Sequence, residues 1–264
     1  MRNGKTFLKN SFCTQPFKLA DVTEDRNAHR LQLMLMSSSP GILDNDDYRI
    51  NIELDEYCSV ELETQSYQRL FQMKTGAKQV MEVKMQKASS LIFLPHPSVP
   101  HESSKFSSKN KFYLSEDCLL IWGEVLTCGR KLNGEVFRLS RYHSVTEIFL
   151  SEKLIVKENL LVAPSLIDVN LPGQLEGYTH QASFTCVGNM LPETIVENIH
   201  ELLLTETDIS FGVSALPVDG FILRLMGNKA EQLYNILKSI ALRITTYKSR
   251  RPFTVHRPPT TVDT

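Results

Sequence analysis

The chain has 264 residues, of which 42% are hydrophobic, and this length fits one large domain or two small ones. The formal net charge is −1, from 29 basic and 30 acidic side chains, which leaves no electrostatic footprint for nucleic acid or an anionic membrane. No apolar run approaches the roughly 20 residues of a membrane helix, and the start of the sequence lacks the long apolar segment of a signal peptide. We therefore expect a globular protein that binds neither nucleic acid nor membrane.

The cysteines are scattered along the chain and contain no CxxC pair. They are Cys13, Cys58, Cys118, Cys128 and Cys186. An odd number without close pairs indicates neither a disulfide framework nor a structural zinc site. Buried thiols in a reducing compartment are the simpler interpretation, so we expect a cytoplasmic protein.

Between residues 29 and 187, apolar and polar side chains alternate with the period of β-strands. The pattern predicts strands over 48–54 and 57–67, joined at Asp55-Glu56, and similar strands follow at a spacing of about 8–12 residues. Short strands at this spacing favour an antiparallel all-β architecture, and no repeat of solenoid length is evident.

Near the C-terminus the apolar period changes to that of a helix. One helix is predicted over about 192–204, and a second, capped by Asn228, over about 229–246. We expect residues 1–248 to form a single β-rich domain that includes both helices, and 249–264 to form a proline-rich tail. The fold is therefore predicted to be mainly β, with a small α/β element at its end.

The stretch LIFLPHPSVPHESSKF opens as a strand and continues with three prolines, none of which can donate to a central ladder. His96 and His101 could begin a metal site, but such a site needs further ligands that converge in space. Residues five apart in an extended chain also point to opposite faces. We interpret the segment as the end of a strand.

Several carboxylates lie inside predicted strands or beside them. Glu61 and Glu63 share one face of a strand, Glu124 follows the stretch LLIWG, and Glu135 follows a predicted turn. These acids could cover a solvated sheet face, or they could line a polar interior that carries a cation, since carboxylates without soft ligands bind a divalent ion weakly. Arg130 lies close enough in sequence to form a structural ion pair with Glu135.

A series of segments occurs in a characteristic order from about residue 12 to 245. They are QPFKL, SSSPGILDNDDYRINIEL with Asp46, VELETQSYQRLF with Thr64 and Gln65, LIFLPHPSVPH, GEVLTCGRKLNGEVF and LEGYTHQASF. The fifth segment contains Glu124, Gly129, Arg130, Gly134, Glu135 and Phe137. Together they resemble the urease accessory proteins called UreD, or UreH in some bacteria. The sequence departs from that family at PGILDND, where the family has a glycine-rich turn, and at His96 and His101, where relatives carry Gln or aromatic residues.

The resemblance implies two stacked β-layers with two C-terminal helices, and a non-enzymatic maturation factor without catalytic residues. Such a protein joins an accessory protein, UreF, and a GTPase, UreG, to urease apoprotein. It binds no cofactor or metal stably, and nickel passes in transit through an internal polar passage.

The resemblance also suggests roles for individual residues. The candidates for lining the nickel passage are Asp46, Glu61, Glu63, Glu124 and Glu135. Thr64, Gln65, Gly129, Arg130, Gly134 and Phe137 form the structural motif, and Tyr178, His180, Leu233 and Ile240 are candidates for the UreF-facing surface.

Two alternatives to nickel conduction stay open at this point. In the first, the chain is a pure adaptor that bridges UreF to urease, and the ion never enters it. In the second, it is a metal-dependent hydrolase that uses His96, His101 or His143 with nearby acids, which requires those histidines to converge on one metal ion. No phosphate-binding loop, GxSxG elbow or HExxH motif supports another reaction centre.

Overall fold

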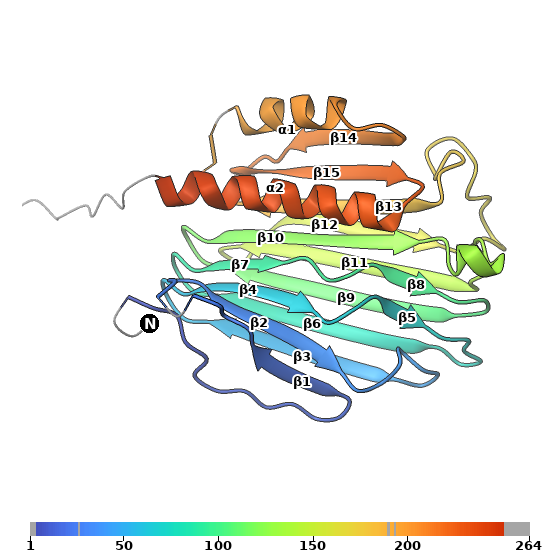
Figure 1. Cartoon of the computed structure of the whole chain (residues 1–264), viewed down its shortest axis with the longest axis horizontal. Coiled ribbons are helices and arrows are strands. Elements are labelled where there is room, and N and C mark those ends of the chain that lie inside the picture. The colour runs from blue at the N-terminus through green and yellow to red at the C-terminus, as the bar shows by residue number, and fades with distance from the viewer. Residues whose placement is uncertain (1–3, 26, 189–190, 193, 251–264) are drawn as a thin grey trace, which may run out of the picture.

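The computed structural model describes residues 4–25, 27–188, 191–192 and 194–250, and for 247–250 it describes only the backbone. These residues form two β-sheets and two α-helices near the C-terminus (Figure 1). The prediction of a mainly-β fold with two stacked β-layers and two C-terminal helices is therefore confirmed.

The larger sheet has ten strands. They are β1 (Phe17–Asp21), β2 (Leu31–Ser37), β4 (Ser59–Thr64), β5 (Gln68–Leu70), β7 (Ser90–Phe93), β8 (Ser98–Pro100), β10 (Leu119–Thr127), β13 (His180–Val187), β14 (Ile209–Ala215) and β15 (Gly220–Gly227). Eight of them follow the order β1-β2-β4-β7-β10-β13-β15-β14, while β8 pairs with β10 and with β5.

The smaller sheet has five strands in the order β12-β11-β9-β6-β3. They are β3 (Asp47–Leu54), β6 (Ala77–Met85), β9 (Lys105–Leu114), β11 (Arg141–Leu150) and β12 (Lys153–Val162). A short 3-10 helix, Lys131–Asn133, lies in the connection between β10 and β11.

From β2 to β11 the chain alternates between the two sheets, so that consecutive coils stack on one another (Figure 1). As a result β2, β4, β7 and β10 run parallel in the larger sheet, and β3, β6, β9 and β11 run parallel in the smaller one. The predicted antiparallel architecture is wrong for this part of the chain. Antiparallel pairing is found at β1–β2, at β11–β12 and among β10, β13, β15 and β14.

The stacked coils turn at three corners that have the same backbone conformation. Tyr57, Ala88 and Asp117 each have a positive φ, of 60°, 56° and 59°. Backbone hydrogen bonds join one corner to the next, from the Tyr57 amide to the Lys87 carbonyl at 3.1 Å and from the Ala88 amide to the Glu116 carbonyl at 3.0 Å. The corners recur about every 30 residues, a solenoid period. This period is evident in the backbone, whereas no repeat of that length is evident in the sequence.

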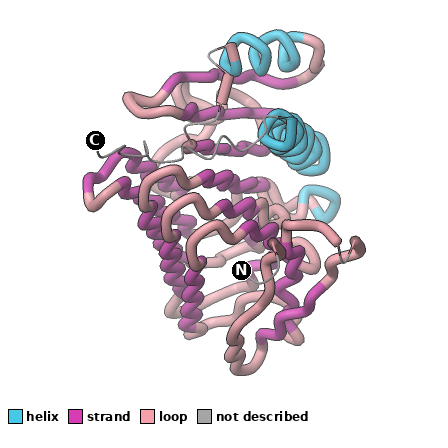
Figure 2. Tube along the Cα trace, turned by 90° about the vertical axis from the view of Figure 1, so that its left-hand side faces the viewer, coloured by secondary structure: helices cyan, strands magenta, loops and turns pink. Residues whose placement is uncertain are grey.

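The two helices pack on the outer face of the larger sheet. They are α1 (Ile195–Leu204) and α2 (Ala230–Arg250), and α2 is seen nearly end-on beside the sheets in Figure 2. A Cβ at Gly123 of β10 would lie 2.8 Å from a methyl group of Leu94 and 3.1 Å from one of Leu237, so a side chain there would crowd the core under α2.

The helix bounds differ slightly from those predicted. Helix α1 begins three residues later than predicted, with Thr194 as its N-cap. Helix α2 begins one residue after the predicted start at 229 and extends to Arg250, so it includes the first two residues of the predicted tail, whose remainder, 251–264, lies outside the described residues. The assignment of residues 1–248 to one domain stays a prediction.

Two substitutions on α2 test how much of the stability comes from packing against the sheet. Leu237 is 1% exposed and packs on β10, whereas Leu242, on the same helix, is 68% exposed. We expect Leu237→Ala to lower the free energy of unfolding by about 2–5 kcal/mol, because it leaves a cavity, and Leu242→Ala to change it by less than about 0.5 kcal/mol. Urea denaturation measures both, and equal losses would show that α2 is not seated on the sheet in this way.

Candidate functional site

Two rows of polar side chains cross the strands and face each other between the sheets. In the larger sheet Glu124 of β10 pairs with Ser183 of β13, which pairs with Arg224 of β15. In the smaller sheet Asn110 of β9, Thr146 of β11 and Glu158 of β12 form the opposite row. Hydrogen bonds join the two rows, because the Thr146 hydroxyl donates to Glu124 at 3.5 Å and Arg224 donates to Glu158 at 3.1 Å.

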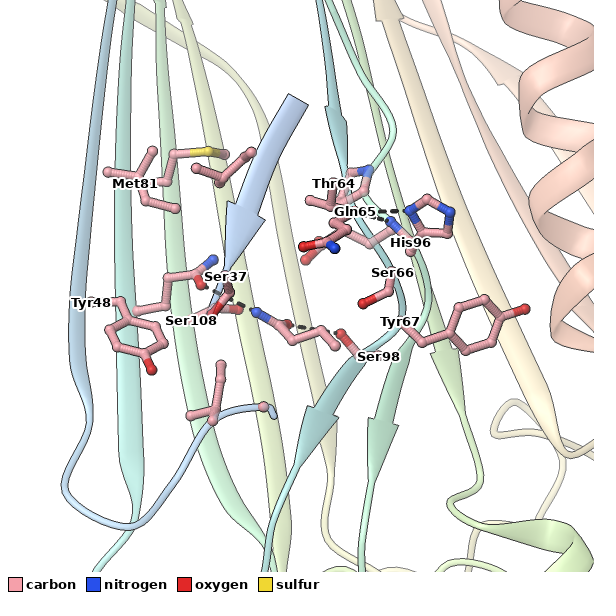
Figure 3. A pocket seen from close by; sticks show the side chains of 18 of the residues that line it. Ser37, Tyr48, Thr64, Gln65, Ser66, Tyr67, Met81, His96, Ser98 and Ser108 are labelled. Carbon is pink, nitrogen blue, oxygen red and sulfur yellow. Dashed lines mark hydrogen bonds between the residues drawn. The ribbon is translucent and has the colours of Figure 1, made fainter. Parts of the chain in front are cut away.

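These rows connect two hollows. An inner cavity of about 130 Å³ lies between the sheets, and a second hollow of about 590 Å³ lies toward β12, β14 and β15. Figure 3 shows the inner cavity, with Tyr48 and Ser108 on the wall of the smaller sheet and Thr64, Gln65 and Ser66 across from them. Glu124 and Tyr142 line both hollows, so these two side chains stand between them.

Glu124 is held in this position by hydroxyl groups of the smaller sheet. Ser144 donates to its two carboxylate oxygens at 3.0 and 3.2 Å, and Asn110 donates to Thr146 at 3.2 Å, which orients the Thr146 hydroxyl. None of the ion pairs among the described residues includes Glu124. Burial raises its pKa to about 7, and the nearby negative charge of Glu158 adds to the increase, while the Ser144 hydroxyl opposes it. The carboxyl can therefore lose its proton to a cation near neutral pH.

Polar atoms on the walls of the hollows are buried without hydrogen-bond partners among the described residues. They are Ser108 Oγ, Asn110 Oδ1 and Trp122 Nε1 at the inner cavity and Gln181 Nε2 at the second hollow. Burying such an atom unpaired costs about 1–3 kcal/mol. The walls also carry apolar side chains, but these unpaired polar atoms suit water or a hydrated ion as the content of the hollows.

Comparison with known proteins identifies the family. The family model described as UreD urease accessory protein matches residues 1–259. The urease accessory protein UreD of Flavobacterium johnsoniae is 46% identical over 245 residues, which cover 92% of this chain and 88% of that protein. The UreD proteins of Acetivibrio thermocellus and Haemophilus influenzae are 35% and 32% identical, over 90% of this chain in each case and over 91% and 93% of those proteins. The chain belongs to the UreD family of urease accessory proteins.

Of the five acids predicted to line the passage, the structure places only Glu124 at the inner cavity and the second hollow. Asp46 accepts hydrogen bonds from the Leu43 amide and the Tyr48 hydroxyl, both at 2.7 Å, and so fixes the turn before β3. The other three form ion pairs: Glu61 with Arg30, Glu63 with Lys238 of α2, and Glu135 with Arg130.

The ion pair of Arg130 and Glu135 closes a compact loop that contains most of the UreD motif. Glu135 also accepts a hydrogen bond from the Glu102 amide, and the Arg130 guanidinium holds the pKa of this carboxyl below its ordinary value. Gly129 has a φ of 120°, and a Cβ there would lie 2.8 Å from the Pro100 carbonyl oxygen, so the loop excludes a side chain.

The remaining motif residues have local structural contacts. The Phe137 amide donates to the Cys128 carbonyl at 2.7 Å, and Gly134 ends the 3-10 helix with a φ of 78°. The Thr64 hydroxyl accepts from the His96 amide at 2.8 Å, while Gln65 lines the inner cavity.

The histidines do not converge on a common point. His96 lies against Tyr67 and Tyr234, His101 packs edge-on against Phe71, and the His143 ring pairs with Asn159. Within the described part of the chain, no group of three His, Cys, Asp or Glu residues could hold a metal ion. The hydrolase alternative therefore lacks the convergent ligands that it requires.

The predicted partner surface needs correction. Leu233 and Ile240 are fully buried between α2 and the larger sheet, so their side chains do not face a partner. His180 is also buried, and burial lowers its pKa to about 4, whereas Tyr178 is half-buried in the loop before β13.

In the described range, no helix is long and apolar enough to cross a membrane.

The residues that sequence reasoning missed are Asn110, Ser144, Thr146, Glu158 and Arg224. A signal for the first three was present, because polar side chains in KFSSKNKFYL and RYHSVTEIFL fall in phase with Phe106, Phe112 and Ile148, which are buried. No local pattern distinguishes Glu158 or Arg224 from acids and bases on a solvated edge.

Replacing Glu124 by Gln tests the burial of this carboxyl in the UreD-family chain. Its pKa of about 7 in the folded state exceeds the ordinary value of 4.5, so the wild-type protein should lose stability as the pH rises from 4.5 to 7. Above pH 7, Glu124→Gln should be more stable than wild type by on the order of 3 kcal/mol. The measurement is urea denaturation at pH 5 and pH 8, with Glu61→Gln as the control, and parallel pH profiles for wild type and Glu124→Gln would contradict the assignment.

Proposed function

We propose that this chain is a non-enzymatic maturation factor that passes Ni²⁺ to urease through the space between its two sheets. Membership of the UreD family supports a role in urease maturation. The observation that carries the nickel proposal is the pair of facing polar rows, which connects the inner cavity through Glu124 to the second hollow at Glu158.

The ligands along this path suit transit better than storage. Carboxylates, hydroxyls and amides are hard oxygen ligands, and Ni²⁺ is bound firmly by imidazole or thiolate groups in preference to them. The rows contribute two carboxylates on opposite walls, together with the hydroxyls of Ser144 and Thr146. An ion that replaces part of its hydration shell with these groups would be held weakly and released readily.

Partners complete the proposed function. We infer that the chain joins a UreF-type accessory protein and a UreG-type GTPase to urease apoprotein, and that GTP hydrolysis by the GTPase accompanies nickel delivery. The chain itself supplies a path and a scaffold, and no catalytic group. The scattered, odd set of five cysteines favours the cytoplasm as the site of this assembly.

A reconstituted activation assay tests the path. Urease apoprotein, the accessory proteins, Ni²⁺, GTP and bicarbonate are combined with wild-type chain or with Glu124→Gln or Glu158→Gln. We expect both variants to capture their partners normally and to slow urease activation about tenfold or more, which corresponds to about 1.4 kcal/mol on the barrier to transit.

Glu61→Gln and Glu63→Gln are the matched controls, because their carboxylates pair with Arg30 and Lys238 and do not line the inner cavity or the second hollow. They should activate urease at the wild-type rate. If all four variants activate urease equally well, the chain is an adaptor and nickel does not pass between its sheets.

A further inference from the structure

We propose that Arg224 is a displaceable counter-ion that closes the outer end of the passage. It forms an ion pair with Glu158 until a divalent cation takes its place at that carboxylate. This inference rests on the proposed function and adds a residue that controls the release of the ion. It starts from an ion pair that connects the two sheets across the second hollow.

The fold directs Arg224 into this hollow. Its neighbours on β15, Leu223 and Leu225, are buried toward the helices, so the side chain of Arg224 lies on the face toward the smaller sheet. Its partner on β14 is Gly212, where an added Cβ would meet nothing within 4 Å. The guanidinium therefore has open space beside it, into which it can move when it leaves Glu158.

The pair is built asymmetrically. The Arg224 side chain is 69% exposed, whereas that of Glu158 is 12% exposed. Both hydrogen bonds, from Nε at 3.3 Å and from Nη2 at 3.1 Å, go to the same oxygen, Oε1. A guanidinium that engages one oxygen forgoes the two parallel bonds of the strongest arginine–carboxylate geometry, and its exposure to water weakens the pair further. Arg224 can therefore leave while Glu158 stays in place.

The charges around the second hollow make Arg224 the competitor of an arriving ion. The acidic residues that line this hollow are Glu124, Glu158 and Glu176, and Arg224 is the one lysine or arginine in the described part of its wall. A divalent cation that reaches Glu158 carries twice the charge of the guanidinium and repels it at short range. The ion and Arg224 therefore compete for one carboxylate. After the ion leaves, the guanidinium returns to Glu158 and lowers the affinity for a second ion from outside.

A purely structural role would give the pair a different behaviour. If Arg224 serves only to pin β15 to β12, its removal should loosen the edge of the two sheets and lower the melting temperature. If Arg224 is a displaceable counter-ion, its removal should leave the melting temperature nearly unchanged and expose Glu158 to cations. Thermal denaturation and cation binding thus separate the two roles.

The pair of Lys157 and Glu147 provides a matched control. Lys157 is 56% exposed and Glu147 is 13% exposed, so an exposed base again pairs with a nearly buried acid, but this pair lies on the outer face of the smaller sheet, away from the two hollows. Glu147 also pairs with Lys109 at 3.6 Å, so it keeps one basic partner when Lys157 is replaced. Lys157→Gln removes one positive charge with the same change in net charge as Arg224→Gln. Any effect of net charge alone should therefore appear in both variants.

The experiment measures binding of NiCl₂ to the purified full-length chain by titration calorimetry at pH 7.5, together with melting temperature and urease activation. We expect Arg224→Gln to bind Ni²⁺ about tenfold more tightly than wild type, because the competing charge is gone. Arg224→Lys should bind with intermediate affinity, Lys157→Gln should match wild type, and Arg224→Gln combined with Glu158→Gln should lose the gain. In the activation assay at low Ni²⁺ concentration, Arg224→Gln should release the ion more slowly and activate urease more slowly.

Each other outcome has a definite meaning. If Arg224→Gln leaves Ni²⁺ affinity unchanged, or lowers the melting temperature far more than Lys157→Gln does, Arg224 is a structural pin and the inference is wrong, although the passage can still stand. If Glu124→Gln and Glu158→Gln activate urease normally, the passage itself fails, whatever Arg224→Gln does.

Discussion

The space between the two sheets must be filled by side chains that project inward from both. The rest of the structure depends on whether these side chains are large and apolar or small and polar at each position along the strands. Face-to-face sheets lie about 10 Å apart, a gap that large apolar side chains close completely. Where Phe93, Phe112 and Trp122 meet, the rings pack against one another, and Phe93 and Trp122 form part of the wall of the inner cavity. Where Ser108, Asn110, Ser144 and Thr146 stand at the corresponding inward positions, the side chains are shorter and polar, and the hollows begin. The proposed passage thus consists of small polar residues at inward positions where the rest of the core has large apolar residues.

Stacking of the coils gives these substitutions their continuity. In a parallel, in-register stack, residues of neighbouring strands at one level point the same way, so a polar residue on one strand lies beside a polar residue on the next. Asn110 and Thr146 are neighbours for this reason, although 36 residues separate them in the sequence. The antiparallel strands β12, β13 and β15 extend both rows to the edge of the fold. A single hairpin could not have built a row of this length.

Sequence reasoning predicted the faces of the strands better than their directions. Alternation in 48–54 and 57–67 shows which side chains are buried together, but it has the same form in a hairpin and in a coil that crosses between sheets. The corner decides between a hairpin and a coil that crosses to the other sheet. There Tyr57 has a positive φ, and its amide donates to the Lys87 carbonyl of the next corner. Two of the corner sequences, LDEYCS and LSEDCL, share Leu, Glu and Cys at matching positions, whereas MQKASS shares only its last serine with the first of them. Backbone hydrogen bonds join one corner to the next despite this difference.

A local pattern can indicate that a residue is buried, but it does not identify the element that packs against it. The candidate residues show this difference. Glu124 follows the apolar stretch LLIWG, and of the two alternatives left open for it, a solvated face or a polar interior, the structure puts its carboxyl between the sheets. The family resemblance suggests a partner-facing role for Leu233 and Ile240, which lie in a helical apolar stripe, and such a stripe shows that something covers it without saying what. Here the larger sheet of the chain itself is the cover. Glu158 and Arg224 had no local signal, since their importance comes only from the opposing strand.

The two ends of the proposed passage differ in the elements that surround them. At the inner cavity, Tyr67 and His96 contact α2, through a hydrogen bond from the Tyr67 hydroxyl to Glu231 and through the Tyr234 ring. The Glu231 carboxylate therefore lies near this end, with the ion pair of Glu63 and Lys238 on the same side of the sheet. At the outer end, Glu158 lies under an exposed guanidinium, beside the edge strands β12 and β14. In the proposed passage, an ion that moves from the first end to the second meets Glu124, whose proton it can displace near neutral pH, and then Glu158, whose counter-ion it must displace. The order of these two exchanges follows from the register of the strands alone.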